Sequence, residues 1–96
     1  MKLLLIMCET EDLLQVREII ENSEVCGYTE IPNLHGAGLF GKRLDTRAFP
    51  GTSCVIFACI KDEKAAELAQ RLSGFREECP ETRTIHAAIV PMDHFF

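Results

Sequence analysis

The stretch from Gly27 to Gly51 reads GYTEIPNLHGAGLFGKRLDTRAFPG. Its first part, Gly27 to His35, predicts a strand. Pro32 cannot donate a ladder hydrogen bond, so that strand should lie at a sheet edge or contain a bulge. Three glycines and three cations follow, and the stretch ends at Phe49-Pro50-Gly51, a strong turn signal. A locally basic, glycine-rich loop therefore interrupts a chain whose formal net charge is −5.

On either side of this stretch the sequence predicts ordinary scaffold. Continuous apolar runs are typical of strands buried on both faces, and apolar residues at helical spacing indicate amphipathic helices. Thr10 and Asp62 are expected to cap the two helices, and Ser73-Gly74 to end the second. In chain order, the predicted elements are a strand over Leu3–Cys8, a helix over Thr10–Asn22, the strand over Gly27–His35, a strand over Ser53–Ile60, a helix from Asp62 to about Leu72 and a strand over Arg83–Val90.

This order predicts a ferredoxin-like α+β sandwich, with a four-stranded antiparallel sheet and two helices on one of its faces. Residues 1–96 are expected to form a single domain. The other sheet face would be bare, yet the runs over Leu3–Cys8 and Ser53–Ile60 are apolar at odd and even positions alike. A chain of 96 residues has no third layer to cover that face. Self-association through the open face is therefore expected.

Composition limits the classes of function. The pI of about 5.1 disfavours nonspecific nucleic-acid binding, which needs a basic face. The five cysteines are odd in number and form no C-x-x-C pair, so reduced, structural thiols in a cytoplasmic protein are predicted. The opening apolar run is too short for a signal peptide or a membrane span and instead predicts a first buried strand.

The glycine-rich loop holds the main binding candidates. Gly36 and Gly38 expose backbone N–H groups and allow close approach of a ligand, and Lys42, Arg43 and Arg47 have the charge to clamp an anion such as a phosphate. The spacing fits neither a Rossmann fingerprint nor a P-loop. The alternative is a mobile surface hairpin with glycines for flexibility and cations for solubility, and the residues alone do not separate the two.

The histidines and cysteines give weaker signals. His35 and His86 are the candidate metal ligands, but their spacing matches no known ligand pattern, and a dispersed histidine is more often structural. No cysteine has the sequence context of a nucleophile, and Cys79 is the one expected to be exposed. No catalytic residue is therefore predicted. A minor hypothesis is a dimeric α+β-barrel enzyme with His86 as its base.

Two short motifs resemble the PII signalling superfamily, and its divergent PII-like branch in particular. Gly27-Tyr28-Thr29-Glu30-Ile31, followed by Gly36-Ala37-Gly38, is similar to the family's second strand and the root of its long T-loop. The resemblance implies a homotrimer that binds an adenine nucleotide or similar effector in clefts between subunits. It also implies that the loop signals to a protein partner, such as a membrane transporter or an enzyme.

The resemblance also suggests roles for particular residues. Thr29 matches a strand threonine near the adenine, Gly36 and Gly38 match the loop-root glycines, and Lys42 and Arg43 lie roughly where the family contacts phosphate. The loop over residues 36–50 corresponds to a short T-loop without the family's modified tyrosine. The family's phosphate-gripping segment is replaced by GFREECPETRTI over residues 74–85, whose acidic residues oppose a triphosphate.

The sequence thus predicts a non-enzymatic, trimeric PII-like regulator. Its effector would be a small nucleotide or another anion, and its partner a protein rather than nucleic acid or membrane. The alternative is a metal-binding protein of the trimeric CutA type, although the tryptophans of that family are missing here.

Overall fold

The structure is a computed structural model that describes residues 1–39 and 41–96. The glycine-rich stretch thus includes one position, residue 40, that lies outside the described residues. The elements, in chain order, are β1 (Lys2–Glu9), a 3-10 turn η1 (Thr10–Asp12), α1 (Leu13–Glu21), β2 (Val25–Leu34), β3 (Gly36–Gly38), β4 (Gly41–Arg43), β5 (Ser53–Ile60), α2 (Asp62–Glu78) and β6 (His86–Pro91).

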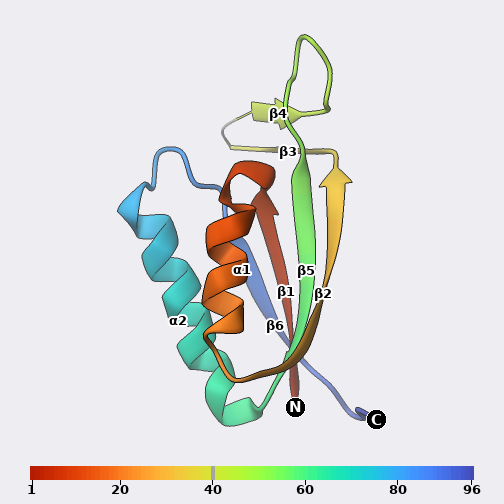
Figure 1. Cartoon of the computed structure of the whole chain (residues 1–96), viewed down its shortest axis with the longest axis vertical. Coiled ribbons are helices and arrows are strands. Elements are labelled where there is room, and N and C mark those ends of the chain that lie inside the picture. Colours follow the sequence, from red (N-terminus) through yellow and green to blue (C-terminus); the bar gives the residue numbers. More distant parts are fainter. Residues whose placement is uncertain (40) are drawn as a thin grey trace.

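Four strands form one antiparallel sheet in the order β2-β5-β1-β6, and both helices cover the same face of it (Figure 1). The predicted ferredoxin-like α+β architecture is confirmed. The two continuous apolar runs became the central strands β1 and β5. Pro32 lies in the edge strand β2, where the register shifts between Ile31 and Leu34 and Asn33 has a φ of 59°. Both the edge position and the irregularity expected for Pro32 are present.

The core lies between the sheet and the helices. Alternate residues of β1 and β5 are buried there against the apolar stripe of each helix, because successive strand side chains point to opposite faces. The largest fully buried side chains are Leu4, Ile6, Ile20, Ile56, Ile60, Leu68 and Leu72. Such a core follows from the predicted elements, since one face of each continuously apolar strand meets the apolar stripe of the helices.

An ion pair fastens α1 to the edge strand. Arg17 Nε donates to Glu30 Oε1 at 2.6 Å, and Arg17 Nη2 donates to Glu30 Oε2 at 2.8 Å. The hydrogen bonds from Arg17 lower the pKa of Glu30, outweighing the effect of its burial. This bidentate contact holds the otherwise weakly covered strand β2 against the helix layer.

The predicted helix caps are wrong. Thr10 lies in the 3-10 turn, and its hydroxyl contacts Thr52, at 2.9 Å from the carbonyl oxygen and 2.7 Å from the hydroxyl. Asp62 is the first residue of α2 and makes no cap hydrogen bond. Its carboxylate pairs instead with the amino group of Met1 at 2.6 Å. In both cases tertiary neighbours provide a partner that the local sequence does not reveal.

The second helix is longer than predicted. It continues through Gly74 to Glu78, because Phe75 packs against the core and outweighs the helix-breaking tendency of glycine, and it ends just before Pro80. The last strand begins at His86 rather than Arg83. The expectation that Cys79 alone is exposed is also wrong, since Cys26 is exposed at a register shift of β2.

The other face of the sheet carries no helix in the described part of the chain. The strand registers place side chains from all four strands on this face, which we call the open face. Its larger apolar members are Leu3, Leu5, Met7, Ile31, Val55, Phe57 and Val90. Several of them are more than a third exposed in the single chain: Met7 (39%), Ile31 (41%), Phe57 (36%) and Val90 (39%). The sequence expectation of a bare but apolar face is correct.

The core makes a direct prediction about stability. Leu68 is 1% exposed, whereas Leu14 on α1 is 69% exposed. We expect Leu68→Ala to lower the free energy of unfolding by about 2–5 kcal/mol, because it removes buried apolar surface and leaves a cavity. The matched control Leu14→Ala should change it by less than about 0.5 kcal/mol. Urea unfolding at one protein concentration measures both, and equal effects would contradict this assignment of the core.

Candidate functional site

A small hairpin crosses the end of the sheet. Strands β3 and β4 pair in register, Gly36 with Arg43 and Gly38 with Gly41, and they form a separate sheet above the ends of β1, β5 and β2 (Figure 1). This hairpin comes from the glycine-rich part of the sequence. The hairpin covers the end of the open face and does not add strands to the main sheet.

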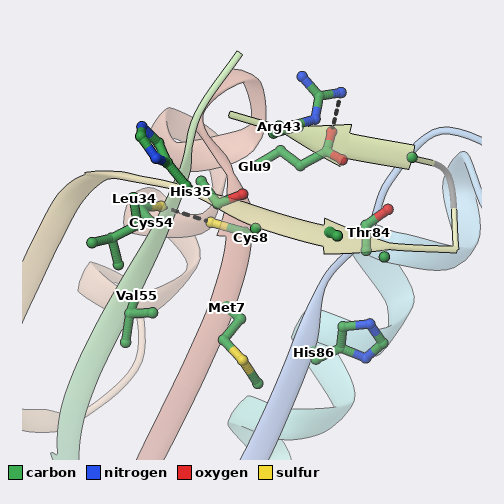
Figure 2. A pocket seen from close by; sticks show the side chains of 15 residues that line it. Met7, Cys8, Glu9, Leu34, His35, Arg43, Cys54, Val55, Thr84 and His86 are labelled. Atoms are coloured by element: carbon green, nitrogen blue, oxygen red, sulfur yellow. Dashed lines mark hydrogen bonds and ion pairs between the residues drawn. The ribbon is translucent and has the colours of Figure 1, made fainter. Parts of the chain in front are cut away.

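A pocket of about 230 Å³ lies beneath this roof. Its walls come from the ends of β1 and β5, from the hairpin and from residues before and within β6 (Figure 2). Those that matter for chemistry are Cys8, Glu9, His35, Arg43, Cys54, Thr84 and His86. The pocket therefore joins the loop root to the open face, and its lining contains sulfur, imidazole, carboxylate and guanidinium groups.

Arg43 is already paired with protein carboxylates. Its Nη2 lies 2.7 Å from Glu9 Oε2, and its Nη1 lies 3.1 Å from Glu11 Oε2. Burial raises the pKa of Glu9, although Arg43 acts in the opposite direction, and the Glu9 side chain is only 12% exposed. Arg43 is thus a cation held in position by acids, and an incoming anion must replace one of those carboxylates.

The turn after β4 is shaped around Arg43. Leu44 N and Thr46 N both donate to Phe49 O, and Asp45 N donates to Gly51 O, so the segment folds back on itself. Gly51 has a φ of +92°, and a Cβ at this position would lie 2.5 Å from Arg43 Nη1. Glycine is needed at position 51 for its backbone conformation and for the space that Arg43 occupies.

The structure brings together some of the predicted binding residues and not others. Gly36, Gly38 and Arg43 line the pocket. Lys42 and Arg47 do not, and Lys42 Nζ lies 5.2 Å from the centre of the Phe49 ring, which is also outside the lining. Thr29 lies on the open face opposite Phe57 and is likewise outside the pocket lining.

Sequence reasoning missed four residues of this site. Glu9, Cys8 and Cys54 lie at the facing ends of β1 and β5, and Thr84 precedes β6 with its Oγ1 buried and without a hydrogen-bond partner among the described residues. The register of β1 with β5, which the two apolar runs do not fix by themselves, places the two cysteines opposite each other. The Arg43 contacts depend on how the hairpin folds over the sheet, which no local pattern indicates.

The described part of the chain gives little support to a metal site or to nucleophilic catalysis. No group of three or more His, Cys, Asp or Glu side chains there is arranged to hold a metal ion. His35 and His86 line the same pocket, so the two candidate ligands are at least brought to one place. Burial raises the pKa of the Cys8 and Cys54 thiols, which therefore stay protonated and are poor nucleophiles.

Comparisons identify the fold. No protein-family model matches the chain, and no curated protein is similar to it in sequence. Among solved structures, CPII from Thiomonas intermedia K12, a nitrogen regulatory PII-like protein bound to ADP, AMP and bicarbonate, is 22% identical with a TM-score of 0.69, covering 95% of this chain and 88% of that one. A protein described as PII-like from Thermus thermophilus is 22% identical with a TM-score of 0.66, covering 92% and 82%.

A third similar structure is a DUF3240 family protein from Shewanella baltica, with 16% identity and a TM-score of 0.60, covering 99% of this chain and 93% of that one. The chain thus has the fold of PII-like signalling proteins, as the sequence resemblance suggested. In the described residues, no helix is long and apolar enough to cross a membrane.

The role of Gly51 can be tested by substituting it with alanine and comparing the same change at Gly74. We expect Gly51→Ala to lower the free energy of unfolding by about 1–2 kcal/mol, because alanine is strained at positive φ and its Cβ would displace Arg43. Gly74 lies inside α2, and a Cβ added there would meet no described atom within 4 Å. Gly74→Ala should therefore raise stability by about 0.5–1 kcal/mol. Chemical denaturation measures both, and a neutral Gly51→Ala would mean that Arg43 does not need this turn.

Proposed function

We propose that this chain is a PII-like regulatory protein without enzymatic activity. Three copies associate through the open face, a small anionic effector binds at the pocket under the β3–β4 hairpin, and the loop over residues 36–50 carries the signal to a protein partner such as a membrane transporter. The main support for this proposal is the position of the pocket, which lies where the base of the loop meets the open face.

The open face supports the assembly. A contiguous apolar surface crossing all four strands is unusual in a monomer and marks an interaction site. Three such faces meeting around a threefold axis would bury it with closed symmetry. The pocket of one chain, about 230 Å³, is smaller than the roughly 300–1,000 Å³ of ordinary ligand sites. A neighbouring subunit would supply the missing wall.

The effector is proposed to be an adenine nucleotide smaller than ATP, or another small anion. The similar protein CPII has been solved with ADP, AMP and bicarbonate. Here Arg43 is the cation of the pocket, and its pairing with Glu9 and Glu11 provides a ready exchange partner for an incoming anion. A triphosphate is not proposed, because the resemblance puts the acidic residues Glu77, Glu78 and Glu81 where the PII family has its phosphate-gripping segment.

The loop is proposed as the partner surface. Lys42, Arg47 and Phe49 are exposed on it and outside the pocket, so they remain accessible when an effector is bound. An effector that draws Arg43 away from Glu9 would move β4 and thereby this surface. The reduced cysteines suit the cytoplasm, which is the proposed location.

The proposed trimer can be tested by adding one negative charge to the open face. We expect the wild type to run as a trimer in native mass spectrometry and light scattering, and Phe57→Glu to shift it to monomers, because a carboxylate at the centre of the apolar face would be buried unpaired. Leu14→Glu, which adds the same charge to the exposed helix surface, is the control and should remain trimeric. A wild type that is monomeric at micromolar concentration would refute the assembly.

The binding site is tested with ADP, AMP and bicarbonate by calorimetry. We expect Arg43→Ala with Arg47→Ala to weaken binding by about tenfold or more, corresponding to the loss of one charge-assisted contact of about 1.4 kcal/mol, while the trimer persists. Arg71→Ala on α2, which removes the exposed pair with Glu67, is the control and should bind normally. Unchanged affinity in the double variant would refute the site, and dissociation into monomers would show that the loop is structural.

A further inference from the structure

Glu9 is the carboxylate that shields Arg43 from the pocket. It is the last residue of β1, its side chain is 12% exposed, and its Oε2 lies 2.7 Å from Arg43 Nη2 in the wall of the pocket (Figure 2). Glu11, the other acid in contact with Arg43, has a side chain that is 57% exposed. Arg43 thus joins one nearly buried carboxylate to one that is well hydrated.

The two carboxylates respond differently when Arg43 turns to a ligand. An exposed carboxylate such as that of Glu11 loses little, because water replaces the departing partner. A shielded carboxylate that loses its cation becomes an unpaired buried charge, which is costly, and such a group neutralises itself by taking up a proton. Among the described residues, Arg43 is the one cation in ion-pair contact with Glu9.

The surroundings of Glu9 offer no second cation. The charged groups that act on it besides Arg43 are Glu11 and Asp12 of η1, and both are acids. Asp12 is itself engaged by Arg83, whose Nε lies 3.9 Å from Asp12 Oδ1. Burial raises the pKa of Glu9 even while Arg43 is beside it, so the loss of Arg43 must raise this pKa further.

Other polar side chains around the pocket complete its chemistry. Ser53 faces Glu9 across the β1–β5 ladder and carries no charge. His35 and His86 also line the pocket, so a test of proton exchange has to separate them from Glu9. Thr84 Oγ1 is buried in the lining without a hydrogen-bond partner among the described residues, which leaves a polar group for a ligand to satisfy.

We propose that Glu9 couples the binding of a small oxyanion to the uptake of one proton, an inference that rests on the effector site proposed above. The oxyanion takes the place of Glu9 on Arg43, and the Glu9 carboxylate accepts one proton from solvent. Apart from this O–H bond no covalent bond forms, and nothing is oxidised or reduced. The bound state then reports the anion and the proton together.

The direction of the pH dependence follows from this exchange. Glu9 has a higher pKa in the anion-bound protein than in the free protein, because Arg43 stabilises its ionised form in the free protein alone. Between these two pKa values the bound protein carries one more proton, so affinity falls by up to about tenfold for each unit by which the pH rises. Outside that window no proton is exchanged at Glu9.

Proton uptake can be measured directly with sulfate, which keeps the same charge throughout the range. Calorimetry in two buffers of different ionisation enthalpy, between about pH 5 and 9, should show the wild type taking up as much as one proton per sulfate bound. An infrared difference spectrum should show the C=O band of a protonated carboxyl group appearing with the anion. Neither measurement requires a change in the protein.

Variants identify the group that takes the proton. Glu9→Gln keeps the shape of the side chain and should abolish the uptake and the new infrared band, and it should bind sulfate more tightly than the wild type at the high end of the pH range. Glu11→Gln is the matched control and should keep the uptake, because that carboxylate is exposed. The double variant His35→Gln with His86→Gln should also keep it. Circular dichroism checks that each variant folds.

Sulfate binding without proton uptake, full uptake retained in Glu9→Gln, or uptake lost in the histidine double variant would each overturn the coupling. Failure of sulfate to bind would overturn it as well, since Arg43 would then not exchange Glu9 for a simple oxyanion. The affinities for ADP and AMP are measured separately, so all of these results leave the proposed regulatory function standing. Absence of binding by every one of these anions would overturn both.

Discussion

The pairing of β1 with β5 is the contact on which the rest of the structure depends. Every residue from Lys2 to Glu9 faces one from Ile60 back to Ser53, without a bulge. Because both strands are apolar along nearly their whole length, this one ladder builds two surfaces. The helices cover one of them, and the other is the open face. Their shared ends also form the floor of the pocket.

The positive charge at the base of the β3–β4 hairpin is neutralised by neighbouring carboxylates. Arg43 extends from the short β4 strand to Glu9 at the end of β1 and to Glu11 in η1, and the turn at Gly51 leaves room for it. The hairpin is therefore fastened to the main sheet through an ion pair rather than through strand pairing. Since the net strength of such a contact is modest when partly solvated, a competing anion can replace it. Under the proposed function, the position of the loop would therefore respond to ligand binding.

Much of the fold was predictable because its signals are local. Continuous apolar runs predicted two buried strands, which are the central ones, and Pro32 predicted an edge strand or a bulge, both of which β2 has. The errors have tertiary causes. Thr10 and Asp62 found partners in Thr52 and the Met1 amino group, and Phe75 carried α2 past Gly74 by packing on the core. In each case a distant contact outweighed a local preference of about 1 kcal/mol.

The sequence by itself determined the order of the elements, the glycine-rich loop and the apolar character of both faces of the central strands, since each depends on periodicity or on backbone preference. Only the tertiary structure decided which cations face the pocket. It turned Arg43 inward to Glu9 and left Lys42 stacked on Phe49, although the two residues are neighbours in the chain. It also placed Cys8 against Cys54, because strand register joins residues that lie far apart in sequence.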